Sequence, residues 1–174
     1  MEQTTTEIKR LENLYKYEIL DTADGDFDEI TSLAAKIFNV PVAIITLVDK
    51  DRIWFKSSYG VEVEEIPRDP GLCSSAILSD DIYIVEDARA DPRTLANPLA
   101  AGSMGLQFYA AAPLRSVNGY KLGTFCIIDK NPRRLDAKET SMLLQLARIV
   151  MDKFELKLQS RLLIKKMQQN FSGQ

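Results

Sequence analysis

The sequence contains no histidine. Imidazole is the commonest general base near neutral pH and a frequent metal ligand, so its absence excludes Ser–His and Cys–His nucleophile pairs and histidine metal sites. It also means that the chain cannot itself supply the phospho-accepting histidine of a histidine kinase. This one count removes many enzyme classes from consideration.

Cysteine, net charge and long apolar runs are also scarce. The chain has two cysteines, Cys73 and Cys126, and its polar start MEQTTTEIKR does not resemble a signal peptide. Both features favour a reducing cytoplasm, in which the thiols stay free. The net charge is −3 and no strongly basic block occurs, which argues against a nucleic-acid surface. No apolar run reaches the roughly 20 residues of a membrane-spanning helix, so we expect no membrane contact.

Acidic residues gather in two short stretches that could suggest a cation site. Neither stretch has the glycine and the final glutamate of a calcium-binding loop, so we expect solvated turns and no metal. One stretch has a second interpretation, because Asp26 with Glu29 three residues later is typical of a helix start with a capping box. The two stretches contain Asp24, Asp26 and Asp28 and, further on, Glu62, Glu64 and Glu65.

The strongest local signal is a predicted β-hairpin over residues 108–129. Its two arms alternate in side-chain type with a period of two, which is typical of strands with one covered face. They meet at Asn118-Gly119, a pair that tolerates the positive φ values of a tight turn. Small residues such as Ala110 and Ala111 leave room above the sheet. A neighbouring helix could fill that room, or it could remain as a pocket.

Two more strands are predicted at residues 42–48 and 52–59, and a short one at 82–85. The tight connections join neighbouring strands, so the sheet should be mainly antiparallel. Helical spacing predicts helices over residues 7–17 and about 26–38. Since the helices gather at the chain ends, we expect them to cover one face of an α+β fold. The second helix should present one apolar stripe, formed by Phe27, Ile30, Leu33, Ala34 and Ile37.

The C-terminal stretch, residues 136–174, predicts a helix of more than thirty residues, which is long for a globular domain. One apolar stripe on it repeats every four residues and another every seven. We expect one stripe to pack on the domain and the other to meet a second copy in a parallel homodimer, although Lys153 and Ser160 interrupt the second. The chain thus divides into an N-terminal helix and turn (1–25), a core (26–135) and this long helix. The four-residue stripe is Val150, Phe154, Leu158 and Leu162; the seven-residue stripe begins at Met142 and continues through Ile149, Leu156 and Leu163, the three residues expected to form the dimer contact.

Five segments match a known family in their order and spacing. They are RLENLYKYEILDT (10–22), FDEITSLAAKIFNVPVAIITLVDKDRIWFKSSYG (27–60), IPRDPGLCSSAIL (66–78), VEDARADPRTLANPL (85–99) and LQFYAAAPLRSVNGYKLGTFCIIDKNPR (106–133). Together they resemble a GAF domain, in particular the bacterial group found ahead of histidine kinases and diguanylate cyclases. The resemblance implies a GAF/PAS-like antiparallel sheet in the order 2-1-5-4-3. It also implies terminal helices on one face of the sheet, with loops, short helices and a ligand pocket on the other.

The family binds cyclic nucleotides, bilins, haem, small metabolites or nothing known, so the resemblance does not identify a ligand or cofactor. Bilin attachment in phytochrome-like members uses a cysteine in the segment that corresponds to 97–107, and no cysteine occurs there. The Asn-Lys-Phe-Asp-Glu signature of cyclic-nucleotide members is also missing. The ligand therefore stays unidentified at this level.

Position on the second strand, or on and next to the loop over the sheet, selects six candidate ligand contacts. The function that we expect is a non-catalytic, cytoplasmic sensor that controls a histidine kinase or cyclase output domain. Two alternatives stay open. One is a ligandless dimerisation module, and the other is a redox enzyme resembling free-methionine sulfoxide reductase, which would use Cys73 and Cys126. The six candidates are Trp54, Asp87, Arg89, Asn97, Gln107 and Tyr109.

Overall fold

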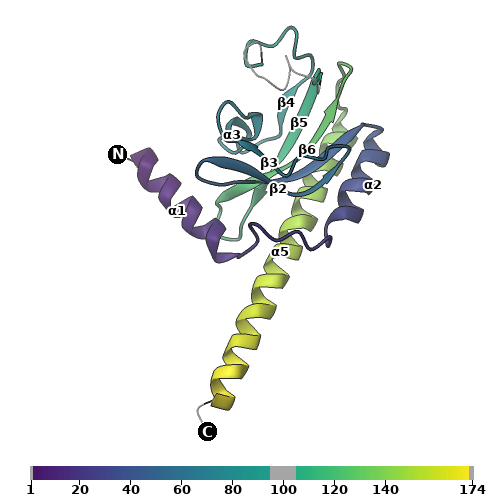
Figure 1. Ribbon diagram of the computed structural model, residues 1–174. Coiled ribbons are helices and arrows are strands. Elements are labelled where there is room, and N and C mark those ends of the chain that lie inside the picture. The colour runs from purple at the N-terminus through teal and green to yellow at the C-terminus, as the bar shows by residue number, and fades with distance from the viewer. Residues whose placement is uncertain (1, 95–104, 173–174) are drawn as a thin grey trace.

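The structure, a computed structural model, describes residues 2–94 and 105–172 (Figure 1). At its centre, the described residues form one six-stranded antiparallel sheet in the order β3-β2-β1-β6-β5-β4. The strands are β1 (Val42–Val48), β2 (Arg52–Tyr59), β3 (Glu65–Pro67), β4 (Tyr83–Val85), β5 (Phe108–Arg115) and β6 (Lys121–Asp129). The helices are α1 (Glu2–Lys16), α2 (Asp28–Phe38), α3 (Leu72–Ala76) and α5 (Ala137–Ser172).

The predicted hairpin is confirmed, since β5 and β6 pair antiparallel from Phe108 with Asp129 to Arg115 with Lys121. The connection is longer than a two-residue turn, and only its glycine, Gly119, has a positive φ, at +84°. The expected strand order is confirmed as well. The short strand β3 adds an edge and shifts the numbering, so that the predicted 2-1-5-4-3 corresponds to β2-β1-β6-β5-β4. The expected α+β class is therefore confirmed.

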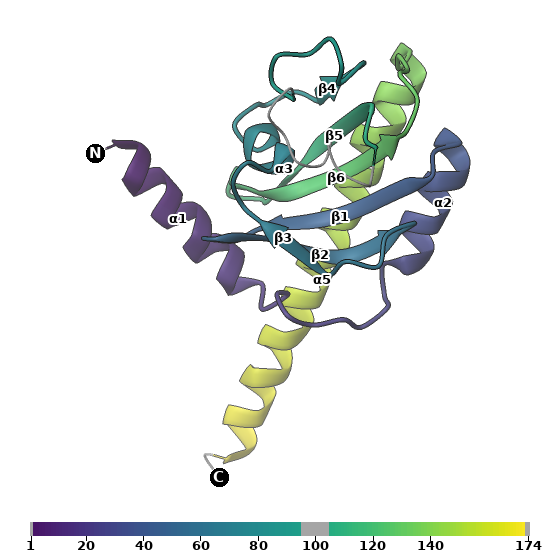
Figure 2. The ribbon, with the colours of Figure 1, turned by 45° about the horizontal axis from the view of Figure 1, so that its top comes forward.

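Each face of the sheet has its own core (Figures 1 and 2). On the face that we call the helix side, α2 and α5 lie on the strands, and the ends of α1 and its connector join them. On the face that we call the loop side, α3 and the following loops form the cover. Large buried residues of the helix side include Leu14, Phe38, Ile45, Trp54, Phe108, Phe125 and Phe154, and those of the loop side include Ile44, Ile53, Phe55, Leu106, Tyr109 and Ile128.

The start and the buried face of α2 differ from the prediction. Phe27, not Asp26, occupies the N-cap position, and no side chain caps the helix. Leu33 and Ile37 are 52% and 46% exposed. The helix instead packs through smaller residues, because Thr31 turns toward β2, where its hydroxyl lies 2.9 Å from that of Ser57. The buried residues of α2 are Thr31, Ala34, Ala35 and Phe38.

The long C-terminal helix is confirmed. A capping box starts it: the Glu139 amide donates to the Asp136 carboxylate at 2.7 Å, and the Asp136 amide donates to the Glu139 carboxylate at 3.0 Å. The four-residue stripe is buried from Val150 to Leu158, and beyond that point the helix extends past the sheet (Figure 1). Among the described residues, no helix combines the length and the apolar character needed to cross a membrane.

The connector between α1 and α2 is fastened to one flank of α5. Lys157 pairs with Asp24 at 2.8 Å, and Arg161 donates to the Glu18 carbonyl at 3.1 Å. The Tyr17 hydroxyl donates to Glu155 on another flank of α5. These contacts hold the middle of α5 in place on the helix side.

Candidate functional site

The loop side of the sheet carries a row of polar side chains at its centre. Thr46 of β1 is paired with Thr124 of β6, and their hydroxyls lie 2.8 Å apart. Cys126 lies two residues further along the same face of β6, between Ile44 and Ala111 of the neighbouring strands. All of these positions are buried. The alternation of the strands therefore brings hydroxyl and thiol groups together under α3.

Tyr109 and Cys73 extend this row. The Tyr109 hydroxyl on β5 lies 3.1 Å from the Cys73 sulfur on α3, and both side chains are buried. The ring of Tyr83 on β4 meets the Tyr109 ring edge-on, with centroids 6.2 Å apart. Gly71 lets α3 approach this closely, because a Cβ at that position would lie 2.4 Å from the Ile53 side chain.

The pKa values of the two thiols are shifted in opposite directions. Hydrogen bonding with Cys126, and then with Tyr109, lowers the pKa of the Cys73 thiol. The contact with Cys73 together with burial raises the pKa of Cys126, and burial followed by the charge of Cys73 raises that of Tyr109. The surroundings therefore make Cys73 the more acidic of the two thiols.

Gln107 and Tyr109 are the predicted site residues that the structure brings together. They lie two residues apart, at the start of β5 and before it, and so project to the same face. The Gln107 backbone is fixed on both sides, since its amide donates to the Asp129 carbonyl at 2.9 Å and its carbonyl accepts from the Ala88 amide at 2.7 Å. Its side-chain oxygen is buried and has no hydrogen-bond partner in the part of the chain that the structure describes.

Asp87 and Arg89 lie at the surface and pair with each other. Their carboxylate and guanidinium groups are 3.0 Å apart, and Arg89 is largely exposed. Asp87 also lines an open depression of about 470 Å³ together with Asp91 and Arg93. Asn97 lies outside the described residues. These candidates therefore form no common site with Tyr109 in the described structure.

Trp54 lies on the wrong face to join Tyr109. Its side chain belongs to the helix-side core, where the Lys56 ammonium lies 5.7 Å from its ring. The residues of β2 that face the loop side are Ile53 and Phe55. Period-two alternation indicates that neighbouring residues face opposite ways, but it does not say which set faces the ligand.

Comparison with known proteins identifies the family. A family model described as GAF domain matches residues 24–152. The chain belongs to the GAF family. Over 130 residues this GAF domain is 40% identical to a cyclic di-GMP phosphodiesterase from Pseudomonas aeruginosa, covering 74% of this chain and 22% of the relative. The chain thus spans about a fifth of that relative's length.

Solved structures with the same fold are more distant in sequence. Free methionine-R-sulfoxide reductase from Neisseria meningitidis, in complex with its substrate, superposes with a TM-score of 0.65 at 21% identity, covering 86% of this chain and 89% of that one. The GAF domain of an Acinetobacter phosphoenolpyruvate-protein phosphotransferase gives a TM-score of 0.65 at 18% identity, covering 86% and 92%. A domain assigned to a two-component sensor histidine kinase from Sinorhizobium meliloti gives 0.58 at 16%, covering 87% and 97%. These likenesses support the GAF fold.

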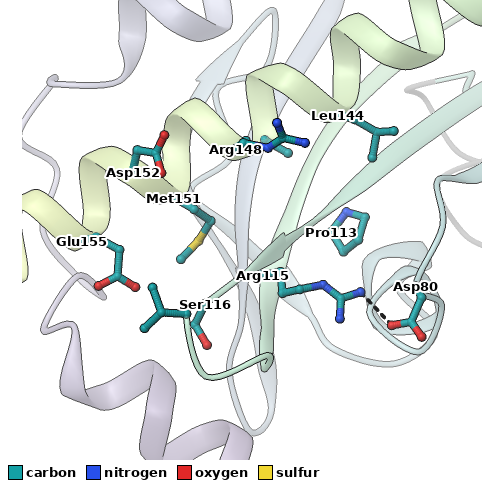
Figure 3. Close-up of a pocket in the computed structure, with 11 residues that line it drawn as sticks. Asp80, Pro113, Arg115, Ser116, Leu144, Arg148, Met151, Asp152 and Glu155 are labelled. Atoms are coloured by element: carbon teal, nitrogen blue, oxygen red, sulfur yellow. Dashed lines mark hydrogen bonds and ion pairs between the residues drawn. The ribbon is translucent and has the colours of Figure 1, made fainter.

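A second concave site of this GAF domain lies at the edge of the sheet beside α5 and was not anticipated from the sequence. It is a cleft of about 300 Å³ between α5 and the end of β5 (Figure 3). Arg148 and Asp152 line it from α5, and Arg115 lines it from β5. The spacing of Arg148 and Asp152, one helical turn apart on a flank next to the buried stripe, was the available signal for this site.

Proposed function

We propose that this GAF domain is a non-catalytic sensory module of bacterial signal transduction, acting in the cytoplasm as a homodimer joined through α5. The observation that carries the proposal is the outward apolar stripe of α5. Ile149, Leu156 and Leu163 are 52%, 67% and 60% exposed. Such a stripe on a helix that already packs its opposite side on a core is typical of a contact with a second helix.

The geometry of α5 supports this dimer. Leu156 lies two residues from both Phe154 and Leu158, so it is about 200° around the helix from each of these buried side chains at 3.6 residues per turn. The stripe therefore points directly away from the sheet. Burying each of its leucines against a second copy would contribute roughly 1.5–3 kcal/mol.

On the loop side, we propose a small-molecule site that includes Tyr109 and Gln107. The unpaired buried oxygen of Gln107 supports this, since a buried acceptor without a donor costs free energy that a ligand could recover. Asp87, Arg89 and Asn97 remain predicted contacts from the adjoining loop, and Trp54 is left out because it faces the helix side. The ligand would act by population shift, favouring one packing of α5 across the dimer.

An output domain would read that packing. The relative from Pseudomonas aeruginosa is named as a cyclic di-GMP phosphodiesterase, and this GAF domain matches only 22% of it. We propose that the domain controls an enzyme of cyclic di-GMP turnover, such as a cyclase, or a histidine kinase. Changing the α5 packing would then change the output activity without any chemistry in the GAF domain itself.

Native mass spectrometry of the freshly purified protein tests both the dimer and the ligand. Leu156→Glu should convert the dimer to a monomer, whereas Leu78→Glu, a similarly exposed leucine after α3, should leave it unchanged. A wild-type protein that is monomeric, or a Leu156→Glu dimer, would contradict the dimer contact. A dimer that retains no small molecule and shows no thermal shift with metabolites would favour the ligandless module instead.

The redox alternative has one observation in its favour, namely that Cys73 and Cys126 belong to the same buried cluster and that their pKa values are shifted in opposite directions. It predicts that reduction of free methionine sulfoxide by a thiol reductant requires both cysteines. Cys73→Ser and Cys126→Ser should each abolish such activity if it exists. Full activity in the double variant, or none in the wild type, discards this alternative.

A further inference from the structure

We propose that the cleft between α5 and the end of β5 binds a zwitterion whose two charges are separated by an apolar spacer, such as a peptide of two or three residues with free termini. The proposal goes beyond the function proposed above, since it needs neither the dimer nor a ligand beside Tyr109. The cleft lies at the open edge of β5 beside α5 (Figure 3), and Tyr109 does not line it.

The cleft exists because β4 is short. Its three residues pair with Tyr109, Ala110 and Ala111 of β5, so that the following residues of β5 have no strand beyond them in the described part of the sheet. The flank of α5 faces this open edge. The middle of the resulting cleft is apolar, with Pro113 on the strand and Ala147 and Met151 on the helix.

One end of the cleft has an excess of positive charge. Asp80 there pairs with Arg115 at 2.7 Å and with Lys121 at 2.8 Å, so one carboxylate faces two cations. Arg148 is a third cation at this end and has no hydrogen bond or ion pair within the described residues (Figure 3). An anionic group placed here would find a guanidinium able to form two parallel hydrogen bonds.

The other end of the cleft is acidic. Asp152 and Glu155 line it from α5. The Glu155 carboxylate accepts a hydrogen bond from the Tyr17 hydroxyl, whereas Asp152 has no hydrogen-bond or ion-pair partner among the described residues. Glu155 lies seven residues beyond Arg148, which at 1.5 Å per residue is about 10 Å along the helix. An ammonium group would therefore be favoured at a point one to two helical turns from the favoured anion position.

This separation of charge selects the class of ligand. Extended peptides span about 3.3–3.6 Å per residue, so the termini of a dipeptide or tripeptide lie roughly 7–10 Å apart. Apolar side chains of such a peptide would contact Ala147 and Met151. A dianion would meet Asp152 and Glu155 at one end, and a polyamine would meet Arg148 and Arg115 at the other, so both are disfavoured.

Isothermal titration calorimetry with the free tripeptide Leu-Ala-Leu tests the proposal. Arg148→Ala should weaken binding at least tenfold, while Arg134→Ala, an exposed arginine that pairs with Glu86 away from the cleft, should not change it. Amidating the peptide's C-terminus should weaken binding to the wild type to a similar degree and have little further effect on Arg148→Ala. N-acetylation of the peptide should likewise weaken binding to the wild type and should have little further effect on binding to Asp152→Asn.

The remaining outcomes overturn the proposal. They are the absence of measurable binding by the wild type, equal binding by Arg148→Ala and Arg134→Ala, and equal binding of free and blocked peptides. The Leu156→Glu variant separates this test from that of the dimer. Leu156 is outside the cleft lining, so peptide binding should persist in that variant even when the dimer is lost.

Discussion

The helix side and the loop side of the sheet bury different kinds of side chain. On the helix side, α2 and α5 cover a core built from large apolar groups, and buried polar groups at the margin near α2 are paired, Thr31 with Ser57 and Lys56 with Thr22. On the loop side, the five-residue α3 covers a smaller core that has a phenol, two thiols and two threonine hydroxyls at its centre. We therefore expect the helix side to provide most of the stability, and the loop side is the face on which we propose the ligand site.

The largest expected effect comes from truncating the centre of the helix side. Phe154 is fully buried, and its ring lies 4.9 Å from that of Phe27. Phe154→Ala should lower the free energy of unfolding by about 3–5 kcal/mol, because it removes a buried ring and leaves a cavity. Urea denaturation measures this, with the exposed Phe171→Ala as the control. Similar losses in the two variants would mean that the helix side does not provide the stability we assign to it.

A smaller effect is expected at the margin of the helix side, where a lysine is buried. Lys56 donates to the Thr22 carbonyl at 2.6 Å and to the Asp24 carboxylate at 3.2 Å. Asp24→Asn would leave the ammonium without a counter-ion, but water reaches Asp24, so we expect a loss of about 2 kcal/mol, less than for a fully buried pair.

The exposed Asp81→Asn is the matched control for this measurement. A loss confined to Asp24→Asn supports the role of Asp24, which pairs with Lys157 as well as with the buried Lys56. Equal stability of the two variants would show that the Thr22 oxygens alone satisfy Lys56.

The sequence was most informative where local pattern and burial agree. The pairing of the arms on either side of Asn118-Gly119 followed from the turn, although both faces of β5 and β6 are buried and not one face alone, as the alternation suggested. The order of the remaining strands depends on contacts between distant segments, and the resemblance to the family supplied it. The long α5 was predictable because a capping box opens it and no breaker interrupts it.

Prediction was wrong where tertiary packing overrides local pattern. The stripe expected on α2 included Leu33 and Ile37, but hydroxyl contacts turn Thr31 inward instead. On β2, the register shifts at Ile45/Thr46, so that Lys56 is an extra residue opposite β1. This bulge brings Ser57 to the same face as Lys56, contrary to simple alternation. Similarly, the cleft of Figure 3 lies where α5 passes the part of β5 beyond β4, and no local pattern indicates that contact between distant segments.

The loop side should be less sensitive than the helix side. Tyr109→Phe removes one hydroxyl and keeps the ring, so the free energy of unfolding should fall by about 1 kcal/mol. The same change should raise the pKa of the Cys73 thiol, because it removes a hydrogen bond that lowers it. Tyr59→Phe, at an exposed tyrosine, is the control. A loss as large as that of Phe154→Ala would remove the distinction between the two faces.

The smallest effect concerns an ion pair that joins α1 to the segment before α3, and this effect depends on pH. Glu7 of α1 pairs with Arg10 on the same helix at 2.7 Å and with Arg68, in the segment before α3, at 2.6 Å. Burial alone would raise the pKa of Glu7, but the hydrogen bonds with both arginines lower it to about 2. A carboxyl whose pKa is lower in the folded state stabilises the fold above its unfolded pKa, about 4.3, and loses that contribution as the pH falls toward 2.

The matched variants Glu7→Gln and Glu12→Gln therefore separate the contribution of the Glu7 ion pairs from the effect of removing any carboxylate of α1, since Glu12 is an exposed residue of the same helix. The wild type should be more stable than Glu7→Gln near neutral pH, and the difference should shrink as the pH falls from about 5 and vanish near 2. Because Glu7 is partly exposed, solvent screening keeps the difference smaller than the pKa shift alone implies. A difference that stays constant over this range would mean that the carboxylate's charge does not join the two covers.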